Sequence, residues 1–522
     1  MITPRRTRLV RVPDLHAFRR AITALSGGAG PQDGVGDDSA SVVLVPTGGA
    51  GRQLQRRFAD GTAPAILTRD EFYGFLHARL PDRSARLSAY DRDVMMQSSA
   101  RATTTALGLA GRWRLRPGLL GEILRFYDQL RRQARNVARF EELVEEALSR
   151  DAEHDRGAER MLAETRVLTA VFRGYEARVQ ASGACDEHAL RERLVAQGVS
   201  PAVRGVVVTV GDWIADPNGL YLADFDLLTR LPGLETLDLV ATDALLASGF
   251  HQRIHDWLPG IEEVELADLG LGPSPVVRPL LGTPGTDPDQ LVFVRRDREE
   301  ELIAVARRMR ARPGLDTLDR VAVVYKRPLP YLYLAPDVFG GSGIPYQASD
   351  ALPLAGEPFA AALDLVLDFV ESGFTRASLV ALLRSPHFAF GPAASPVGRE
   401  GVSALDRRLS ELRYLGGFDR LAALEGVLAD AEPDVRDAWR AAYAAAEQPA
   451  PLLVPAPASQ QYRRLLDFLA AWAAPIAEGA EPRSLRARAA VRGTLESLMT
   501  AHAANDEAAI VVTDIASRVR RS

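Results

Sequence analysis

Cysteine is almost absent from this sequence. The chain of 522 residues contains one cysteine, Cys185. A single cysteine excludes an internal disulfide bond and every metal site built from several thiolates. It stands in the segment Gly183-Ala184-Cys185-Asp186, where no catalytic partner can be identified. We therefore interpret Cys185 as a small packing residue rather than a nucleophile.

Lysine is equally scarce. Lys326 is the only lysine, so 62 of the 63 basic residues are arginines. Any chemistry that demands a lysine ammonium group must use Lys326 or be absent. A metal-dependent nuclease core of the restriction-enzyme type carries a D/E-x-K element, but Val324 stands two residues before Lys326. The sequence thus offers no candidate catalytic residue for such a nuclease.

The chain also lacks long apolar runs. No stretch approaches the roughly 18–20 apolar residues that cross a bilayer, and Val10-Arg11-Val12-Pro13 stands where an export segment would be apolar. We expect a cytoplasmic protein with no targeting peptide and no membrane contact. The composition, 47% apolar and 25% charged, is typical of globular proteins, and the length predicts two to four domains. The net charge of −5 means that any DNA contact needs a local basic surface.

The first half of the chain has the pattern of an α/β protein. Residues 41–45 (SVVLV) and 65–68 predict short buried strands, each followed by a helix that begins near residue 52 or 69. Residues 89–196 are rich in Ala, Leu, Arg and Glu with helical periodicity, which predicts a helical insertion. Strands return at 204–210 and 237–241. The simplest arrangement is a helical block inserted between strands of one sheet.

A Gly/Pro-rich stretch at 273–289 is the best linker candidate. After it we predict strands at 291–295 and 320–325 on either side of a charged helix at 299–312. Residue 352 onward is mostly helical, with a proline-rich interruption at 448–458. The chain ends on a helix without a C-terminal glycine or polar tail, and we interpret this end as a truncation.

A glycine-rich turn follows the first predicted strand, where a phosphate-binding loop belongs. It contains Gly48, Gly49 and Gly51, followed by Arg52 and Gln53. Against GxxxxGK[ST], the first glycine, the lysine and the magnesium-binding hydroxyl are all missing. Arginine replaces the compact ammonium group poorly, and without Ser or Thr the metal loses a protein ligand. We interpret the turn as a degenerate nucleotide loop, so ATP and Mg²⁺ are not expected cofactors.

The acidic motif of an NTPase is also incomplete. Asp212 follows the predicted strand at 204–210, where a magnesium-binding acidic pair belongs, but Trp213 occupies the place of the catalytic carboxylate. His251 and His255 have the i, i+4 spacing of zinc ligands on a helix. The Glu of HExxH is absent and no third ligand stands out, so a solvated helix face is the favoured interpretation. We predict no catalytic residue and no metal site.

Two segments are candidates for DNA binding. The first interleaves aromatic residues with arginines, and we expect three of its arginines (132, 135 and 139) to share one helix face. Such a face can follow a phosphate backbone while rings stack on bases. Four glutamates follow at once, so a solvated, salt-bridged helix is the competing and favoured interpretation. The second is a proline-rich loop from Lys326 to Tyr333. The candidate residues are Arg125, Arg132, Arg135, Arg139, Arg327, Tyr331 and Tyr333.

A family resemblance rests on the order and spacing of short motifs between about 293 and 388. These are Asp297-Arg298-Glu299-Glu300-Glu301, Leu318 through Lys326, Gly343-Ile344-Pro345-Tyr346, Leu352-Pro353-Leu354 and Leu382-Leu383-Arg384-Ser385-Pro386. The stretch resembles the second motor domain of UvrD/Rep-like superfamily I helicases. It resembles still more the inactivated helicase-like region of AddB and related RecB-family exonucleases. The N-terminal half matches mainly by layout.

This resemblance implies an α/β fold of two RecA-like, P-loop NTPase-like parallel-sheet lobes with large helical insertions. Residues 1–288 would form the first lobe, with the insertion at about 89–196. Residues 289–522 would begin the second, with an insertion at about 355–508 and a nuclease domain beyond the C-terminus.

The implied function is a non-catalytic, helicase-like DNA-binding scaffold of a DNA repair and recombination nuclease. Its partners would be single-stranded or duplex-end DNA and a helicase-nuclease subunit. The complete protein would then be an enzyme although this chain is inactive. Two alternatives stay open, an active ATP-dependent helicase subunit with an atypical loop and a protein-interaction scaffold without a DNA role.

Overall fold

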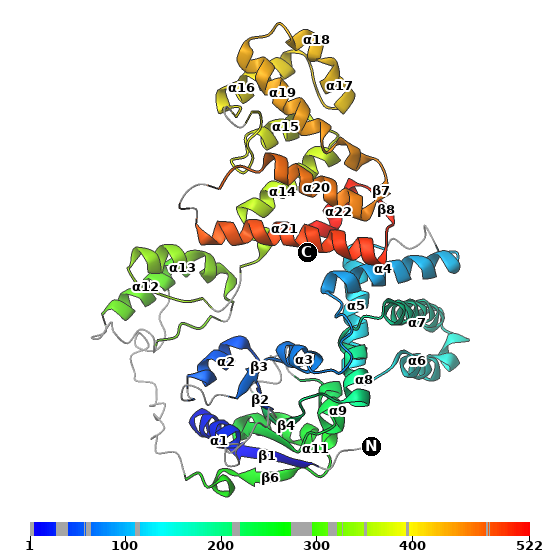
Figure 1. Ribbon diagram of the computed structural model, residues 1–522, viewed down its shortest axis with the longest axis vertical. Helices are drawn as coiled ribbons and strands as arrows, with labels where there is room; N and C mark the ends of the chain where they lie inside the picture. Colours follow the sequence, from blue (N-terminus) through cyan, green and yellow to red (C-terminus); the bar gives the residue numbers. More distant parts are fainter. Residues whose placement is uncertain are drawn as a thin grey trace.

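The computed structural model shows an α/β domain, a helical arm and a second, helical region (Figure 1). The structure describes residues 5–27, 40–56, 58, 64–109, 115–210, 220–272, 295–311, 321–325, 327–348, 352–392, 396–476, 479 and 481–521. The predicted linker at 273–289 and nearly all of the predicted strand at 291–295 lie outside these residues.

The α/β domain is built on one sheet of six parallel strands in the order β3-β2-β4-β5-β1-β6. The strands are β1 (Arg6–Val12), β2 (Ala40–Leu44), β3 (Ala65–Leu67), β4 (Val203–Thr209), β5 (Thr236–Thr242) and β6 (Glu262–Glu265). The valine and leucine runs form central strands because a parallel sheet buries both of its faces. The strands predicted at 41–45, 65–68, 204–210 and 237–241 are thus confirmed.

Helices cover both faces of the sheet. The helices of one face are α1 (Leu15–Gly27) and α2 (Gly48–Gln55). Those of the other face are α3 (Arg69–His77), α8 (Glu187–Gln197), α9 (Leu222–Arg230) and α11 (His251–Trp257). Strand β2 continues through α2 to β3 on one side, whereas the neighbouring β4 continues through α9 to β5 on the other side. The order therefore reverses between β2 and β4, and ligands of open α/β sheets bind outside the carboxyl ends of such strands.

Strand β1 is a feature that the sequence analysis missed. It lies between β5 and β6 although it carries arginines at positions 6, 8 and 11. Arg8 is the register partner of Asp238 on β5 and donates two hydrogen bonds to its carboxylate, from Nε at 2.5 Å and from Nη2 at 2.8 Å. A charge inside a sheet is tolerated because this neighbour compensates it.

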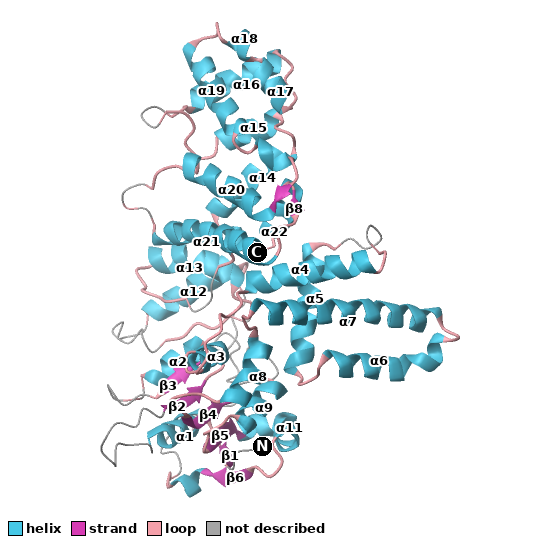
Figure 2. Ribbon diagram, turned by 45° about the vertical axis from the view of Figure 1, so that its right-hand side comes forward, coloured by secondary structure: helices cyan, strands magenta, loops and turns pink. Residues whose placement is uncertain are grey.

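Helices fill the chain between β3 and β4, where the sequence predicts a helical insertion. Its helices are α4 (Ala89–Ala106), α5 (Pro117–Arg132), α6 (Val137–Ala152), α7 (Arg156–Ser182) and α8. Figure 2 shows α6 and α7 side by side in an arm that projects away from the sheet. Helix α4 instead reaches the C-terminal region, where the Asn505 side chain donates to Asp91 at 2.9 Å. The insertion thus links the two halves of the chain.

The second half differs from the predicted parallel-sheet lobe. Its first described helices are α12 (Arg298–Arg310) and α13 (Leu329–Gly341), which pack on each other. Residues 321–325 form no strand, so the strand predicted at 320–325 is wrong over these residues. Val323 and Tyr325 pack against the two helices, but Val324 is 89% exposed. A parallel strand needs a paired neighbour, and the described residues supply none here.

The remaining residues form a helical region with its own core, as the pattern after residue 352 predicts. Its helices are α14 (Pro358–Glu371), α15 (Arg376–Leu383), α16 (Arg399–Glu411), α17 (Phe418–Ala423), α18 (Glu425–Leu428), α19 (Pro433–Glu447), α20 (Ala458–Trp472), α21 (Pro482–Asn505) and α22 (Val512–Val519). Within the described part of this half, the strands are β7 (Ala456–Pro457) and β8 (Ala509–Ile510), an antiparallel pair. No described helix combines the length and the hydropathy needed to cross a bilayer. The chain is therefore an α/β protein with one parallel sheet in its described residues.

Candidate functional site

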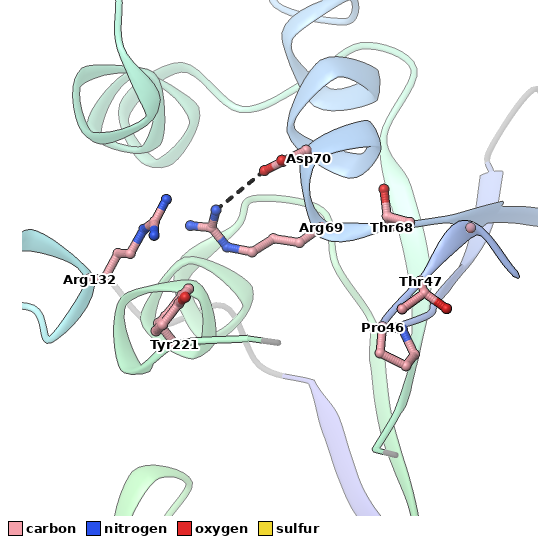
Figure 3. A pocket seen from close by; sticks show the side chains of 8 residues that line it. Pro46, Thr47, Thr68, Arg69, Asp70, Arg132 and Tyr221 are labelled. Atoms are coloured by element: carbon pink, nitrogen blue, oxygen red, sulfur yellow. Dashed lines mark hydrogen bonds and ion pairs between the residues drawn. The ribbon is translucent and has the colours of Figure 1, made fainter. Parts of the chain in front are cut away.

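A polar pocket of about 280 Å³ lies at the carboxyl ends of β2 and β3. Pro46 and Thr47 reach it directly after β2, and Thr68 and Arg69 directly after β3. Tyr221, which precedes α9, and Arg132, the last residue of α5, complete it, as Figure 3 shows. The pocket occupies the place where an open α/β sheet binds its ligand.

The predicted glycine turn has a different geometry from a phosphate-binding loop. Helix α2 begins at Gly48, because the Thr47 hydroxyl accepts a hydrogen bond from the Ala50 N–H at 3.2 Å and caps the helix. Gly48 and Gly49 therefore belong to the first helical turn. Only Pro46 and Thr47 separate the valine that extends β2, Val45, from the helix. A connection this short cannot wrap around phosphates.

The other residues of the degenerate loop lie along α2. Gly51 is buried, and a Cβ there would contact Val45 and Ile66 at 3.4 Å. Its role is close packing of the helix on the sheet rather than ligand contact. Arg52 and Gln53 are exposed. Asp212 lies outside the described residues, so its predicted place at the end of β4 stays a prediction.

A buried ion-pair network lies where a nucleotide would need open space. Arg69 is 6% exposed and donates to both oxygens of Asp224, from Nε at 2.7 Å and from Nη2 at 3.0 Å. Its Nη1 also donates to Glu187 at 3.1 Å. Glu187 in turn accepts from Arg132, from Nε at 2.8 Å and from Nη2 at 3.0 Å. The two guanidinium groups lie 5.2 Å and 4.9 Å from the centre of the Tyr221 ring.

The pKa shifts of Arg69 and Glu187 determine the charge of this network. Burial lowers the pKa of Arg69, but the charge and hydrogen bonds of Asp224 outweigh it, so the pKa is raised. Burial raises the pKa of Glu187, but the hydrogen bond from Arg132 and the charge of Arg69 outweigh it, so the pKa is lowered. Both groups stay ionised near neutral pH and neutralise each other. The network is therefore structural, and it offers an incoming phosphate little net positive charge.

The structure separates the arginines that were expected on one helix face, so this prediction is wrong. Arg132 ends α5, Arg135 lies in the following turn, and Arg139 belongs to α6. The chain turns because Ala134 adopts a left-handed conformation, with φ of 55°. The Asn136 side chain then accepts from the Arg139 N–H at 2.7 Å and starts the new helix.

Most of the interleaved side chains serve packing or ion pairs. Arg125 and Arg139 pair with Glu122 and Glu142 three residues away along their own helices. Of the aromatic residues, Tyr127 is buried, whereas Phe126 is 37% exposed. Phe126 packs edge-on against Phe140 with centroids 5.4 Å apart. The ion pairs of Arg125 and Arg139 agree with the salt-bridged helices that the sequence favours.

The second candidate segment is helical from Leu329 onward, and Lys326 lies outside the described residues. Tyr331 and Tyr333 lie in the first turns of α13, whose start is favoured by the fixed φ of Pro328 and Pro330. Tyr331 stacks on Tyr325 with centroids 4.3 Å apart and donates to Glu301. Arg327 is exposed just before the helix. Of the three candidates here, Arg327 and Tyr333 are exposed, whereas the stacked Tyr331 is partly buried.

An arginine-rich pocket that the sequence did not indicate lies beside the network. Its volume is about 330 Å³, and it is formed by the turn after α5 together with α8 and α9. Four arginines line it against two carboxylates, and two of the arginines are neutralised, Arg131 by Glu192 and Glu176 and Arg230 by Asp226. The charged lining residues are Arg131, Arg135, Arg191, Arg230, Glu192 and Asp226. Among the seven predicted DNA contacts, Arg135 thus lies in this pocket, and the pocket was missed because its arginines are far apart in sequence.

Comparison of the chain with protein-family models and with curated protein sequences gives no match.

Proposed function

We propose that the chain is a non-catalytic, helicase-like DNA-binding scaffold that acts with a nuclease in DNA repair or recombination. The arginine pocket carries the DNA part of the proposal. Arg135 is exposed at this pocket, and a guanidinium group there suits a phosphate of a nucleic-acid backbone, because arginine binds phosphate through paired N–H donors. A DNA strand following the α5–α6 turn would bring phosphates to Arg135 without needing base-specific contacts.

The sheet crevice supports the non-catalytic part of the proposal. The two-residue connection between Val45 and α2 leaves no loop to cradle a triphosphate, and the Arg69 network fills the neighbouring space. Replacing Arg52 by Lys and Gln53 by Thr restores the lysine and the hydroxyl of the consensus, but not its first glycine, without lengthening this connection. We therefore expect the double variant R52K/Q53T to show no DNA-stimulated phosphate release above the unaltered chain. Phosphate release in either protein would favour the active helicase alternative.

Fluorescence anisotropy with a labelled single-stranded 20-mer tests the DNA proposal. We expect binding at low salt that Arg135→Ala weakens several-fold and whose salt dependence it reduces by about one phosphate contact. Arg160→Ala is the matched control, because Arg160 is 81% exposed on the distant arm and pairs with Glu164. Equal loss in both variants, or no binding by the unaltered chain, would contradict the proposal and leave the protein-interaction scaffold.

A further inference from the structure

Two histidines of α11 and one glutamate of the edge strand β6 meet on the surface of the α/β domain. His251 and His255 are one helical turn apart, so their rings lie on the same side of the helix. Both Nε2 atoms contact the same oxygen of Glu263, at 2.7 Å and 3.0 Å. Among the described residues, these three form the one His, Cys and carboxylate group whose donor atoms all lie within 4.8 Å of one another.

The local fold places these side chains together. A π-helical turn, η1 (Leu246–Phe250), precedes α11, and Gly249 within it has a φ of 94° that disfavours other residues. The chain then re-enters a regular helix at His251. On β6, Glu263 is the register partner of Leu9, whose side chain belongs to the sheet face that α11 covers. Glu263 therefore points toward α11, but because β6 is an edge strand its side chain stays 33% exposed.

We propose that His251, His255 and Glu263 form a zinc site with an open fourth position. Two imidazole nitrogens and one carboxylate oxygen are a ligand set typical of zinc, which also accepts water or a partner's donor atom as the fourth ligand. A tetrahedral zinc ion with bonds of about 2.0–2.1 Å separates its donor atoms by about 3.3–3.4 Å. The observed nitrogen-to-oxygen separations, 2.7 Å and 3.0 Å, would have to open by about 0.3–0.7 Å to reach this geometry.

The surroundings favour a cation in this position. Arg11 donates to the other oxygen of Glu263 at 3.2 Å and so orients the carboxylate, as second-layer partners of metal ligands commonly do. The charge of Arg11 is offset by Asp243, whose carboxylate lies 3.5 Å from it. Two further glutamates of β6, Glu262 and Glu265, are exposed. The three ligand side chains are all partly exposed, so an ion can enter from solvent without a rearrangement of the core.

The bound ion would tie a helix to the edge of the sheet. Strand β6 pairs with β1 alone among the described strands, so its outer edge is open to further pairing. A zinc ion shared by α11 and β6 would hold this strand in place. The site lies at the opposite end of the strand order from the β3–β2 edge that lines the polar pocket. Its role is therefore independent of the proposed DNA binding.

Calorimetric titration of the tag-free full chain, stripped with a chelator, with zinc chloride tests this site. We expect one Zn²⁺ per chain and a rise in the melting temperature on zinc addition. The double variant His251→Ala/His255→Ala should lose both effects. Glu263→Gln should weaken binding by more than about 100-fold, since even outer partners of a metal are worth roughly 10–100-fold. Co²⁺ in place of Zn²⁺ should give the visible absorption of tetrahedral coordination.

His154→Ala is the matched control, because His154 is exposed on the helical arm, away from this cluster. It should bind Zn²⁺ as the unaltered chain does. The three altered side chains are surface residues, and circular dichroism of each variant checks that it folds. Zinc binding that is absent from the unaltered chain, or that survives in the double variant, would overturn the proposal.

Discussion

At the scale of single residues, Arg69 is the side chain on which the polar pocket depends most. Two carboxylates, Asp224 and Glu187, share its guanidinium group, and Asp224 is 2% exposed. The Tyr73 hydroxyl also donates to Asp224 at 2.6 Å. Burial, and after it the charge of Asp224, raises the pKa of Tyr73, so the tyrosine stays a neutral donor. Removing Arg69 would leave the buried Asp224 without its guanidinium partner, while Glu187 would keep Arg132 as a partner.

We therefore predict that Arg69→Met lowers the free energy of unfolding by about 3–5 kcal/mol, the usual cost of breaking a buried ion pair from one side. Urea denaturation measures this loss. Arg160→Met, on the exposed arm, is the control and should leave the midpoint unchanged. Equal midpoints for the two variants would show that the Arg69 network does not stabilise the fold.

The pH dependence of stability has a definite sign at Glu187. Its pKa is lowered in the folded chain below the ordinary value of 4.5, so below that pH the unfolded state binds more protons. The contribution of Glu187 is present above pH 4.5 and is lost as the pH falls toward its folded pKa. Glu187→Gln should flatten this part of the stability profile, which denaturation at a series of acidic pH values can detect.

The sequence predicted some of these residues and missed others for a physical reason. Pro46 and Thr47 follow a recognisable strand, so their place at the pocket was predictable. The Arg69 network was not, because Glu187 and Asp224 are 118 and 155 residues away along the chain. Neither carboxylate has a local motif that marks its partner. The third ligand of the histidine pair was missed in the same way, because Glu263 belongs to a strand while the histidines lie on a helix.

At the scale of elements, the spacing of the arginines led to a wrong prediction at the boundary between α5 and α6. The periodic spacing continues through residues 133–136 although the helix does not. The usual signal, a glycine in the left-handed conformation, is replaced by Ala134. The runs of valine and leucine in β2, β4 and β5 left no such ambiguity, because apolar runs of that length between turn residues fit buried parallel strands. Strand β1 was missed because the arginines at positions 6, 8 and 11 interrupt its apolar pattern.

Substitution of Asn136 tests that boundary, because the free energy of unfolding should change in opposite directions at a capped helix start and within an uninterrupted helix. Its side chain caps α6, so Asn136→Ala should lower the free energy of unfolding by about 1 kcal/mol. In an uninterrupted helix the same change would raise it by a few tenths of a kcal/mol, because alanine is the better helix former. Chemical denaturation decides between the two signs. Asn136→Asp, which keeps a capping oxygen, should restore most of the loss.

At the scale of the whole molecule, a net charge of −5 restricts how DNA can bind. The attraction must come from a local concentration of arginines such as the pocket beside α5, while the rest of the surface repels the strand. If six or more phosphates are engaged, affinity should fall by about three orders of magnitude between roughly 50 and 200 mM salt. Anisotropy titrations across that range measure the slope. An affinity that does not change with salt concentration would contradict the proposed phosphate contacts.

The position of the helical insertion also has a consequence for synthesis of the chain. Strand β2 pairs on one side with β4, so Val42 cannot pair until Val206 has been synthesised. Strand β1 likewise cannot pair until β5 and β6 have been synthesised. At roughly 5–20 residues per second a ribosome needs on the order of 10–30 s to deliver the missing neighbours. During that interval the edges of β1 and β2 that lack these neighbours are exposed, while the arm, whose contacts are local, can already fold. The nascent chain is therefore most in need of a chaperone until β4, β5 and β6 have emerged.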